Sequence, residues 1–76
     1  MENIETLDAK RLLCPMPVIK TQNKIKKMLP GQKLIVTCTD PGTLQDIPAW
    51  CRINGHKLEK IDEAQFEVTF HIIVGE

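Results

Sequence analysis

Apolar and polar side chains alternate most regularly near the end of the chain, over residues 66–74. Apolar side chains occupy every second position there, and most positions between them are polar, which is the period of a strand with one face in a core. The apolar set is Phe66, Val68, Phe70, Ile72 and Val74. The pattern predicts a strand over 66–74 that buries this whole set, Phe66 included.

Three further segments predict strands with less regular patterns. Residues 4–8 form a brief candidate, and residues 33–39 are rich in β-branched side chains with few charges, which favours a central strand. The proline and glycine of the turn at 40–42 end that strand. Residues 56–61 form the third candidate, with an imperfect alternation, and residues 62–65 are expected to turn the chain into the last strand.

A helix is predicted from Pro15 to about Leu29. Pro15 suits the first helical position, where a backbone N–H would have no partner in any case, and Pro17 still lies in the first turn. Pro30-Gly31 marks the end of the helix. Its apolar positions recur at helical spacing and are expected to face the core: Val18, Ile19, Ile25, Met28 and Leu29.

A second helix is predicted over residues 43–54. Thr43 and Asp46 have the spacing of a capping box, and Gly55 is placed to end the helix. Pro48 would remove one intrahelical hydrogen bond if Thr43 were the N-cap, so a start near Asp46 after a looser turn is the alternative.

The predicted order of elements is βαβαββ, in a single domain over residues 1–76. Short connections imply parallel pairing through the first crossovers and a hairpin at the end. The expected fold class is α/β, a two-layer α/β sandwich in which a mixed four-stranded sheet carries both helices on one face.

Composition limits the classes of function. Lysine plus arginine number 10 and aspartate plus glutamate number 10, so no strong field directs the chain to nucleic acid or to a membrane. The N-terminus lacks the features of a secretory signal, and no stretch approaches the roughly 20 apolar residues of a membrane helix. The three cysteines and two histidines show no metal-ligand spacing. We expect a cytoplasmic protein without metal or cofactor, monomeric when free and without a stable nucleic-acid complex.

Candidate chemistry centres on Cys14, which begins the run Cys14-Pro15-Met16-Pro17. A helix N-terminus stabilises negative charge through its unpaired N–H groups and its dipole, and this favours the reactive thiolate. Both prolines lack an N–H, so Met16 and Val18 are the nearest backbone donors. We expect a modestly lowered pKa for Cys14, which suits reversible transfer.

Several different short motifs are distributed over most of the chain. They are Leu7-Asp8, Leu12, Cys14-Pro15-Met16-Pro17, Pro30-Gly31, Asp40-Pro41, Asp46-Ile47, Trp50-Cys51 and Gly55-His56. In this order and spacing the chain resembles the TusA (SirA-like) family of small sulfur-carrier proteins. Arg11 is a departure, because the family often has glycine at this position, and a backbone conformation that favours glycine would be strained by arginine.

The resemblance implies a carrier that holds sulfur as a persulfide on Cys14. It implies a cysteine desulfurase as the sulfur donor, a downstream acceptor protein and, in the namesake branch, thiolation of a tRNA wobble uridine to 2-thiouridine. Such a carrier is a sulfurtransferase component without independent turnover chemistry. Pro15, Pro17, Asp40 and Asp46 are the positions that support the motif.

Basic residues near Cys14 are candidates for docking a partner. Lys10, Arg11 and Lys20 form this set, with Lys10 and Arg11 preferred. Lys24 and Lys27 continue from Lys20 along a helix face, for which a solvated surface is the alternative interpretation.

The other distinctive side chains have structural interpretations. Cys38 and Cys51 are expected to be buried and inert, although a resolving role for Cys51 stays open. His56 is expected to pack or cap, His71 to point outward from its strand, and Trp50 to join the core.

Two other classes of function stay open beside the sulfur carrier. One is a regulatory module that binds protein or RNA through its basic helix. The other is a thiol redox protein, which the absence of a Cys-x-x-Cys pair disfavours.

Overall fold

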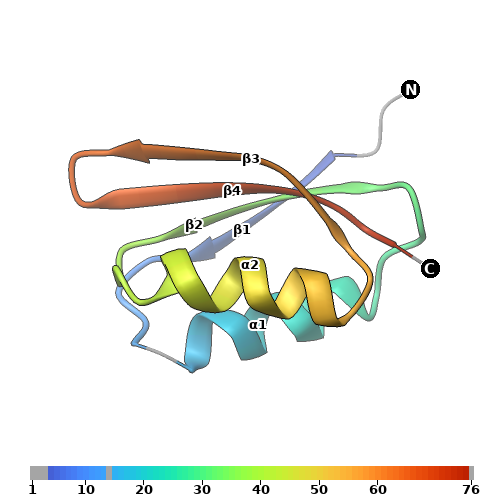
Figure 1. Cartoon of the computed structure of the whole chain (residues 1–76), viewed down its shortest axis with the longest axis horizontal. Coiled ribbons are helices and arrows are strands. Elements are labelled where there is room, and N and C mark those ends of the chain that lie inside the picture. Colours follow the sequence, from blue (N-terminus) through green and yellow to red (C-terminus); the bar gives the residue numbers. More distant parts are fainter. Residues whose placement is uncertain (1–3, 14, 76) are drawn as a thin grey trace.

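The computed structural model describes residues 4–13 and 15–75 (Figure 1). Within them the chain forms four strands and two helices in the predicted order βαβαββ. The elements are β1 (Ile4–Ala9), α1 (Met16–Ile25), β2 (Lys33–Cys38), α2 (Thr43–Ile53), β3 (Lys57–Ala64) and β4 (Glu67–Ile73). The bounds of β1 and β2 agree with the predicted ones to within one residue.

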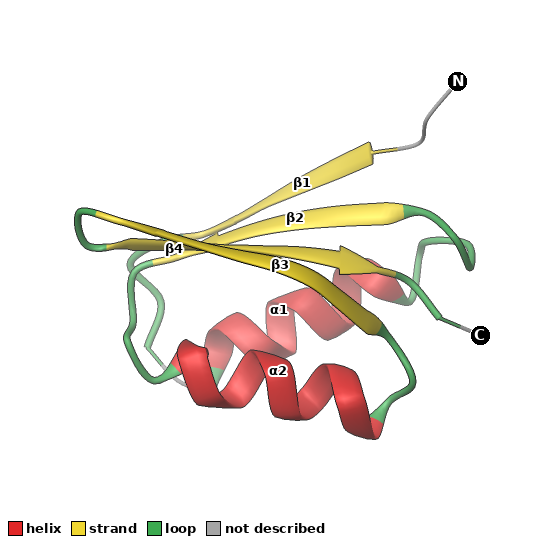
Figure 2. Ribbon diagram, turned by 45° about the horizontal axis from the view of Figure 1, so that its top comes forward, coloured by secondary structure: helices red, strands yellow, loops and turns green. Residues whose placement is uncertain are grey.

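The strands form one mixed sheet in the order β1-β2-β4-β3. β1 and β2 pair in parallel, whereas β4 is antiparallel to both β2 and β3. β3 therefore runs in the same direction as β2, with β4 inserted between them. The predicted parallel pairing is confirmed for the first crossover and is wrong for the second, because β2 and β3 are not neighbours in the sheet. Figure 2 shows both helices against the same face of the sheet, which confirms the two-layer α/β sandwich.

The core lies between the two central strands and the two helices. In β2 and β4 every second side chain faces the helices and is buried. Phe70 is the largest fully buried side chain, and Ile25 and Ile47 meet the sheet from α1 and α2. Removal of this apolar surface from water is the main force that holds the layers together.

α1 ends at Ile25, before the predicted end at Leu29. The N–H groups of Lys27 and Met28 bond carbonyls three residues back, at 3.0 and 2.9 Å, so the chain tightens into a turn of 3₁₀ type. This turn buries Met28 and leaves Leu29 69% exposed. The predicted position of Leu29 in the core is therefore wrong.

The buried face of α1 also differs from the predicted one. Pro17, Thr21 and Ile25 are buried, whereas Ile19 is 41% exposed. Thr21 is tolerated inside because its hydroxyl donates a hydrogen bond to the carbonyl of Pro17 at 2.8 Å. Since a buried threonine adds no apolar signal, the sequence pattern pointed to Ile19 instead.

Pro15 is the N-cap of α1 and not its first helical residue, which corrects the predicted start by one position. Its carbonyl accepts the N–H of Ile19 at 3.1 Å. Pro17 lies in the first turn, as predicted. The helix thus has a proline where a side-chain cap usually stands.

α2 begins at Thr43, which excludes the alternative start near Asp46. Thr43 is not the N-cap; its hydroxyl donates to the carbonyl of Asp40 at 2.6 Å. Pro48 lies inside the helix, and Gly55, with a φ of 77°, follows its end as predicted. Neither helix of the described chain is long and apolar enough to span a membrane.

β3 extends to Ala64, beyond the predicted end at Ile61. Most of the residues expected to form the turn, 62–65, pair with β4 instead. Charged side chains are accepted there because β3 is an edge strand, where they also discourage pairing with other chains. A bulge between Leu58 and Lys60 accounts for the imperfect alternation of this strand.

Phe66 is the clearest error in the predicted last strand. β4 begins at Glu67, and Phe66 lies in the hairpin turn with a φ of 65° and 93% of its surface exposed. The other members of the predicted apolar set, Val68, Phe70, Ile72 and Val74, are buried as expected. A period of two continues into the turn, and such a pattern does not tell where strand pairing stops.

Candidate functional site

The candidate site is the connection between β1 and α1. The predicted nucleophile, Cys14, lies outside the described residues. Its sequence neighbours on both sides are described, in the loop 10–13 and from Pro15 onward. The geometry of the site is therefore the geometry of these neighbours.

Asp8 holds two of the predicted docking residues at the end of β1. Its carboxylate accepts the backbone N–H of Lys10 at 2.9 Å, and its carbonyl accepts the ammonium of Lys20 at 2.8 Å. The second bond ties α1 to the edge strand across twelve positions of sequence. Lys20 is thus a structural tether, and Asp8, which the sequence analysis did not choose as a site residue, organises the loop.

Arg11 adopts a φ of 67°, in the left-handed region that glycine enters most easily. Its N–H donates to the hydroxyl of Thr39 at 2.9 Å, which fastens the loop to the end of β2. The loop therefore has the conformation expected for a glycine, with arginine in that place. Strained backbone is retained where surrounding contacts hold it, and such positions cluster at functional sites.

We expect Arg11→Gly to raise the free energy of unfolding by about 0.5–1 kcal/mol, because glycine removes the strain of an L-residue at positive φ. Lys10→Gly is the matched control, since Lys10 does not have a positive φ and glycine there adds only chain entropy. Urea unfolding followed by circular dichroism measures both. Equal losses of stability in the two variants would contradict a strained Arg11.

Exposed apolar side chains occur in the loop and in the first part of α1. Leu13 is 75% exposed, Met16 48% and Ile19 41%. The N–H of Met16 donates to the carbonyl of Leu13 at 2.9 Å, so it is already engaged and is not the free donor that the sequence analysis expected. An apolar surface with basic residues beside it is typical of a surface that docks a protein.

The lysines of α1 do not form a separate basic face. Lys24 makes an ion pair with Glu5 of β1 at 2.7 Å, next to the bond between Lys20 and Asp8. Both lysines therefore connect α1 to the edge of the sheet. Of the predicted docking residues, Lys20 has its charged group bonded to the sheet. In the described part of the chain, the charged groups of Lys10 and Arg11 make no such bond.

Asp40 and Asp46, predicted to support the motif, lie at the start of α2. The Asp40 carboxylate accepts the N–H of Gly42 at 3.0 Å, and its carbonyl accepts both the N–H and the hydroxyl of Thr43. Asp46 lies in the first turn of α2, where a negative charge is favourable. Both residues shape the turn after β2, and that turn includes Thr39, the partner of Arg11.

The other two cysteines are free and fully buried, as predicted. Burial raises the pKa of Cys38 to about 11, although a hydrogen bond with Thr43 opposes the shift. Burial also raises the pKa of Cys51 to about 11. Neither thiol is available as a nucleophile at neutral pH, which argues against a resolving role for Cys51.

The histidines and the tryptophan have packing roles. The rings of Trp50 and His56 stack with centroids 5.0 Å apart, and His56 Nδ1 accepts the N–H of Gly75 at 2.9 Å. Burial lowers the pKa of His56. No cluster of metal-ligating side chains occurs among residues 4–13 and 15–75.

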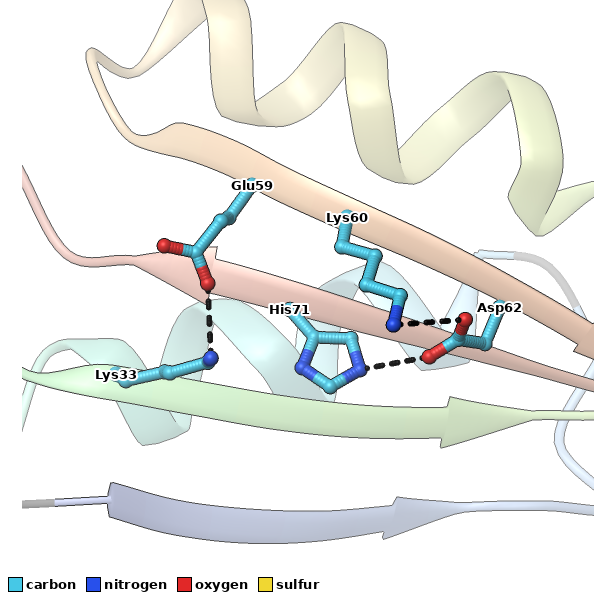
Figure 3. Close-up of polar contacts among 5 residues, drawn as sticks. All are labelled: Lys33, Glu59, Lys60, Asp62 and His71. Atoms are coloured by element: carbon cyan, nitrogen blue, oxygen red, sulfur yellow. Dashed lines mark hydrogen bonds and ion pairs between the residues drawn. The ribbon is translucent and has the colours of Figure 1, made fainter.

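The face of the sheet opposite the helices carries ion pairs that sequence reasoning missed (Figure 3). Lys33 meets Glu59 at 2.8 Å, and Asp62 contacts both Lys60, at 3.5 Å, and His71, at 3.0 Å. His71 points outward, as predicted. Lys60 and Asp62 are two positions apart on β3, and pairing with β4 places His71 beside them. Exposed pairs of this kind contribute less than about 1 kcal/mol each. They stabilise the exposed face and lie away from the loop 10–13.

Comparisons with known proteins identify relatives over nearly the whole chain. The family model described as "Sulfurtransferase TusA" matches residues 5–74. The sulfur carrier protein TusA of Pseudomonas paraeruginosa is 48% identical over 59 residues, which are 76% of this chain and 75% of that protein. The putative sulfur carrier protein YrkI of Bacillus subtilis is 42% identical over 64 residues, 83% of this chain and 85% of that protein.

Other relatives are longer than this chain. The putative sulfur carrier protein YrkF of Bacillus subtilis is 39% identical over 88% of this chain, and the matched part is only 36% of its length.

Among solved structures, a SirA-like protein from Desulfitobacterium hafniense superposes with a TM-score of 0.81 at 20% identity, covering 95% of this chain and 99% of that one. That similarity supports the fold.

Proposed function

This chain belongs to the TusA family of sulfurtransferases. We propose that it accepts a persulfide sulfur on Cys14 from a cysteine desulfurase and passes it to an acceptor protein. The structural observation that carries the proposal is the burial of the other two thiols, Cys38 and Cys51, whose pKa values are raised to about 11. Cys14 is the thiol left for chemistry at neutral pH.

The proposed transfer is an exchange between sulfur atoms. The Cys14 thiolate attacks the terminal sulfur of a donor cysteine persulfide, a new S–S bond forms at Cys14, and the donor sulfur leaves as a thiolate. No net oxidation occurs, because one S–S bond replaces another and the proton of the terminal sulfur stays with the transferred group. Delivery is a second exchange with Cys14 as the donor: a thiolate of the acceptor protein attacks the terminal sulfur of the Cys14 persulfide, and the Cys14 sulfur leaves as a thiolate.

The surroundings of the loop 10–13 support docking of successive partners. Leu13, Met16 and Ile19 offer exposed apolar contacts, and Lys10 and Arg11 add positive charge. We propose a single carrier domain over residues 1–76 and a cytoplasmic location, where free thiols such as Cys38 and Cys51 stay reduced. Thiolation of a tRNA uridine is the proposed end use.

Incubation with a cysteine desulfurase and cysteine tests the proposal. Intact mass spectrometry should detect the addition of one sulfur atom to the unmodified chain and none to Cys14→Ser. An adduct of the same size on the serine variant would assign the sulfur to another residue and exclude Cys14 as the carrier.

We expect the double variant Lys10→Ala/Arg11→Ala to accept sulfur more slowly without unfolding. Removal of two surface charges beside the loop reduces electrostatic steering of an acidic partner, with an expected fall of about three- to tenfold in kcat/KM at low salt. The initial rate of sulfur loading measures the effect, and added salt should reduce the difference from the unmodified chain. Identical rates at low salt would remove these residues from the docking surface.

A further inference from the structure

A groove lies between the β3–β4 hairpin and the start of α2. It has a volume of about 390 Å³ and is lined by Thr39, Pro41, Leu44 and residues 63–68. Figure 1 shows the hairpin turn, the β2–α2 connection and the loop after β1 at the same end of the molecule. Thr39 lines the groove and also accepts the N–H of Arg11, so the groove adjoins the loop that leads to Cys14.

Phe66 lines the groove, and its side chain does not pack in the core. Its side chain is 93% exposed, and its φ of 65° is one that hairpin turns normally assign to glycine or asparagine. Among the described residues other than glycine, only Arg11 and Phe66 have a positive φ. An exposed aromatic ring on strained backbone adds nothing to the core, and an outlier of this kind points to a role outside the fold.

The charge of the groove indicates the chemistry of its occupant. Glu63 and Glu67 line it, and none of its described lining residues is basic. Thr39 joins the groove to the loop of Lys10 and Arg11 through its hydrogen bond with the Arg11 N–H, so two basic residues belong to a loop that adjoins the acidic groove. Complementary charges of both signs fix the orientation of a partner.

We propose that this groove docks the protein that donates sulfur to Cys14, and that this donor places an apolar side chain flanked by lysine or arginine beside Phe66. The inference rests on the proposed function. A donor must cover the loop 10–13 to reach Cys14, and a standard interface covers about 800 Å² on each partner. On a chain whose total surface is 5079 Å², an area of that size extends from the loop to the adjoining groove.

Phe66→Gly is the decisive variant, because it removes the ring and relieves the strained backbone together. Its midpoint of thermal unfolding should rise or stay unchanged, so a loss of docking cannot come from unfolding. In sulfur loading from a panel of cysteine desulfurases, KM should rise about tenfold with little change in kcat, as for a central aromatic contact. The charge-reversed variant Glu63→Lys/Glu67→Lys should also raise KM, and more strongly at low salt.

Leu29→Ala is the matched control, since Leu29 is 69% exposed and precedes β2, away from the groove. It should leave KM unchanged. A KM for Phe66→Gly equal to that of the unmodified chain would overturn the docking proposal alone, whereas failure of every desulfurase to load the unmodified chain would overturn the proposed function as well. Sedimentation of the free chain completes the test: a dimer that Phe66→Gly dissociates would assign the groove to a second copy and overturn the donor proposal.

Discussion

Replacing Cys14 with serine is expected to abolish both sulfur loading and the fast alkylation of the native chain. Cys38 and Cys51 are fully buried and have pKa values raised to about 11. At pH 8 only about one in a thousand of such thiols is ionised, and burial also blocks access of the reagent. Brief exposure to iodoacetamide followed by intact mass spectrometry should therefore find one modified cysteine in the unmodified chain and none in the variant.

The same experiment in urea provides its control. Unfolding exposes all the thiols, so the unmodified chain, which has three cysteines, should take three labels and Cys14→Ser two. Cys51→Ala should keep the fast native reaction. Fast labelling of native Cys14→Ser would mean that a second thiol is accessible, and the assignment of Cys14 would then lose its structural support.

Phe70→Ala is expected to cost about 3–5 kcal/mol of the free energy of unfolding. Phe70 is the largest fully buried side chain and lies on β4, a central strand that packs against the helices. A chain of 76 residues has a total stability of about 4–11 kcal/mol at the usual 0.05–0.15 kcal/mol per residue. The variant should therefore lose about half of it, measured as a lower midpoint of urea unfolding.

Phe66→Ala is the matched control for Phe70→Ala, because the same atoms are removed from a side chain that is 93% exposed. It should change the free energy of unfolding by less than about 0.5 kcal/mol. Similar losses of stability in the two variants would mean that the Phe66 side chain is buried in the folded protein, which would contradict its exposed position in the hairpin turn.

The sequence predicted which elements form, and local effects decided where they end. The order of six elements follows from composition and periodicity, and the inward set on β4 follows from its period of two, which the core enforces. The end of α1 could not be predicted, because Met28 is buried as its spacing predicts but lies in a turn of 3₁₀ type, which apolar spacing does not distinguish from an α-helix. The burial of Thr21 could not be predicted from apolar spacing, because it depends on a hydrogen bond of the Thr21 hydroxyl within the helix.

The extent of β3 and the position of Phe66 failed for a different reason. Strand pairing through the hairpin keeps charged residues in β3, although their propensity favours a turn. Phe66 has an apolar side chain of the kind usually found in a core, but its backbone conformation is that of a turn residue and its side chain is exposed. Propensity describes single residues, and both errors arise where cross-strand register determines the structure.

The candidate site was predictable in part. The run that begins at Cys14 is a sequence motif, and Arg11 is unusual in the sequence because the family often has glycine there. The sequence could not predict that the loop keeps a backbone conformation typical of glycine at Arg11. It also could not predict the bond from Lys20 to Asp8, by which a predicted docking residue ties α1 to β1. The groove beside Thr39 joins residues far apart in sequence, so no local pattern announces it.

The two alternative classes of function have less structural support. A dithiol redox cycle needs a second accessible thiol, and Cys38 and Cys51 are both buried. A basic helix that binds RNA is weakened by the contacts of Lys20 and Lys24 with β1, which occupy two of its charges. The family and the burial of the other thiols both favour the sulfur carrier.

Locating the transferred sulfur tests the central claim most directly. After loading by a cysteine desulfurase, alkylation and digestion with trypsin, the peptide 12–20 contains Cys14, and the peptide 34–52 contains both Cys38 and Cys51. We predict one added sulfur atom on the peptide 12–20 and none on the peptide 34–52. Sulfur on the peptide 34–52, or no added sulfur on either peptide, would contradict a persulfide carried by Cys14.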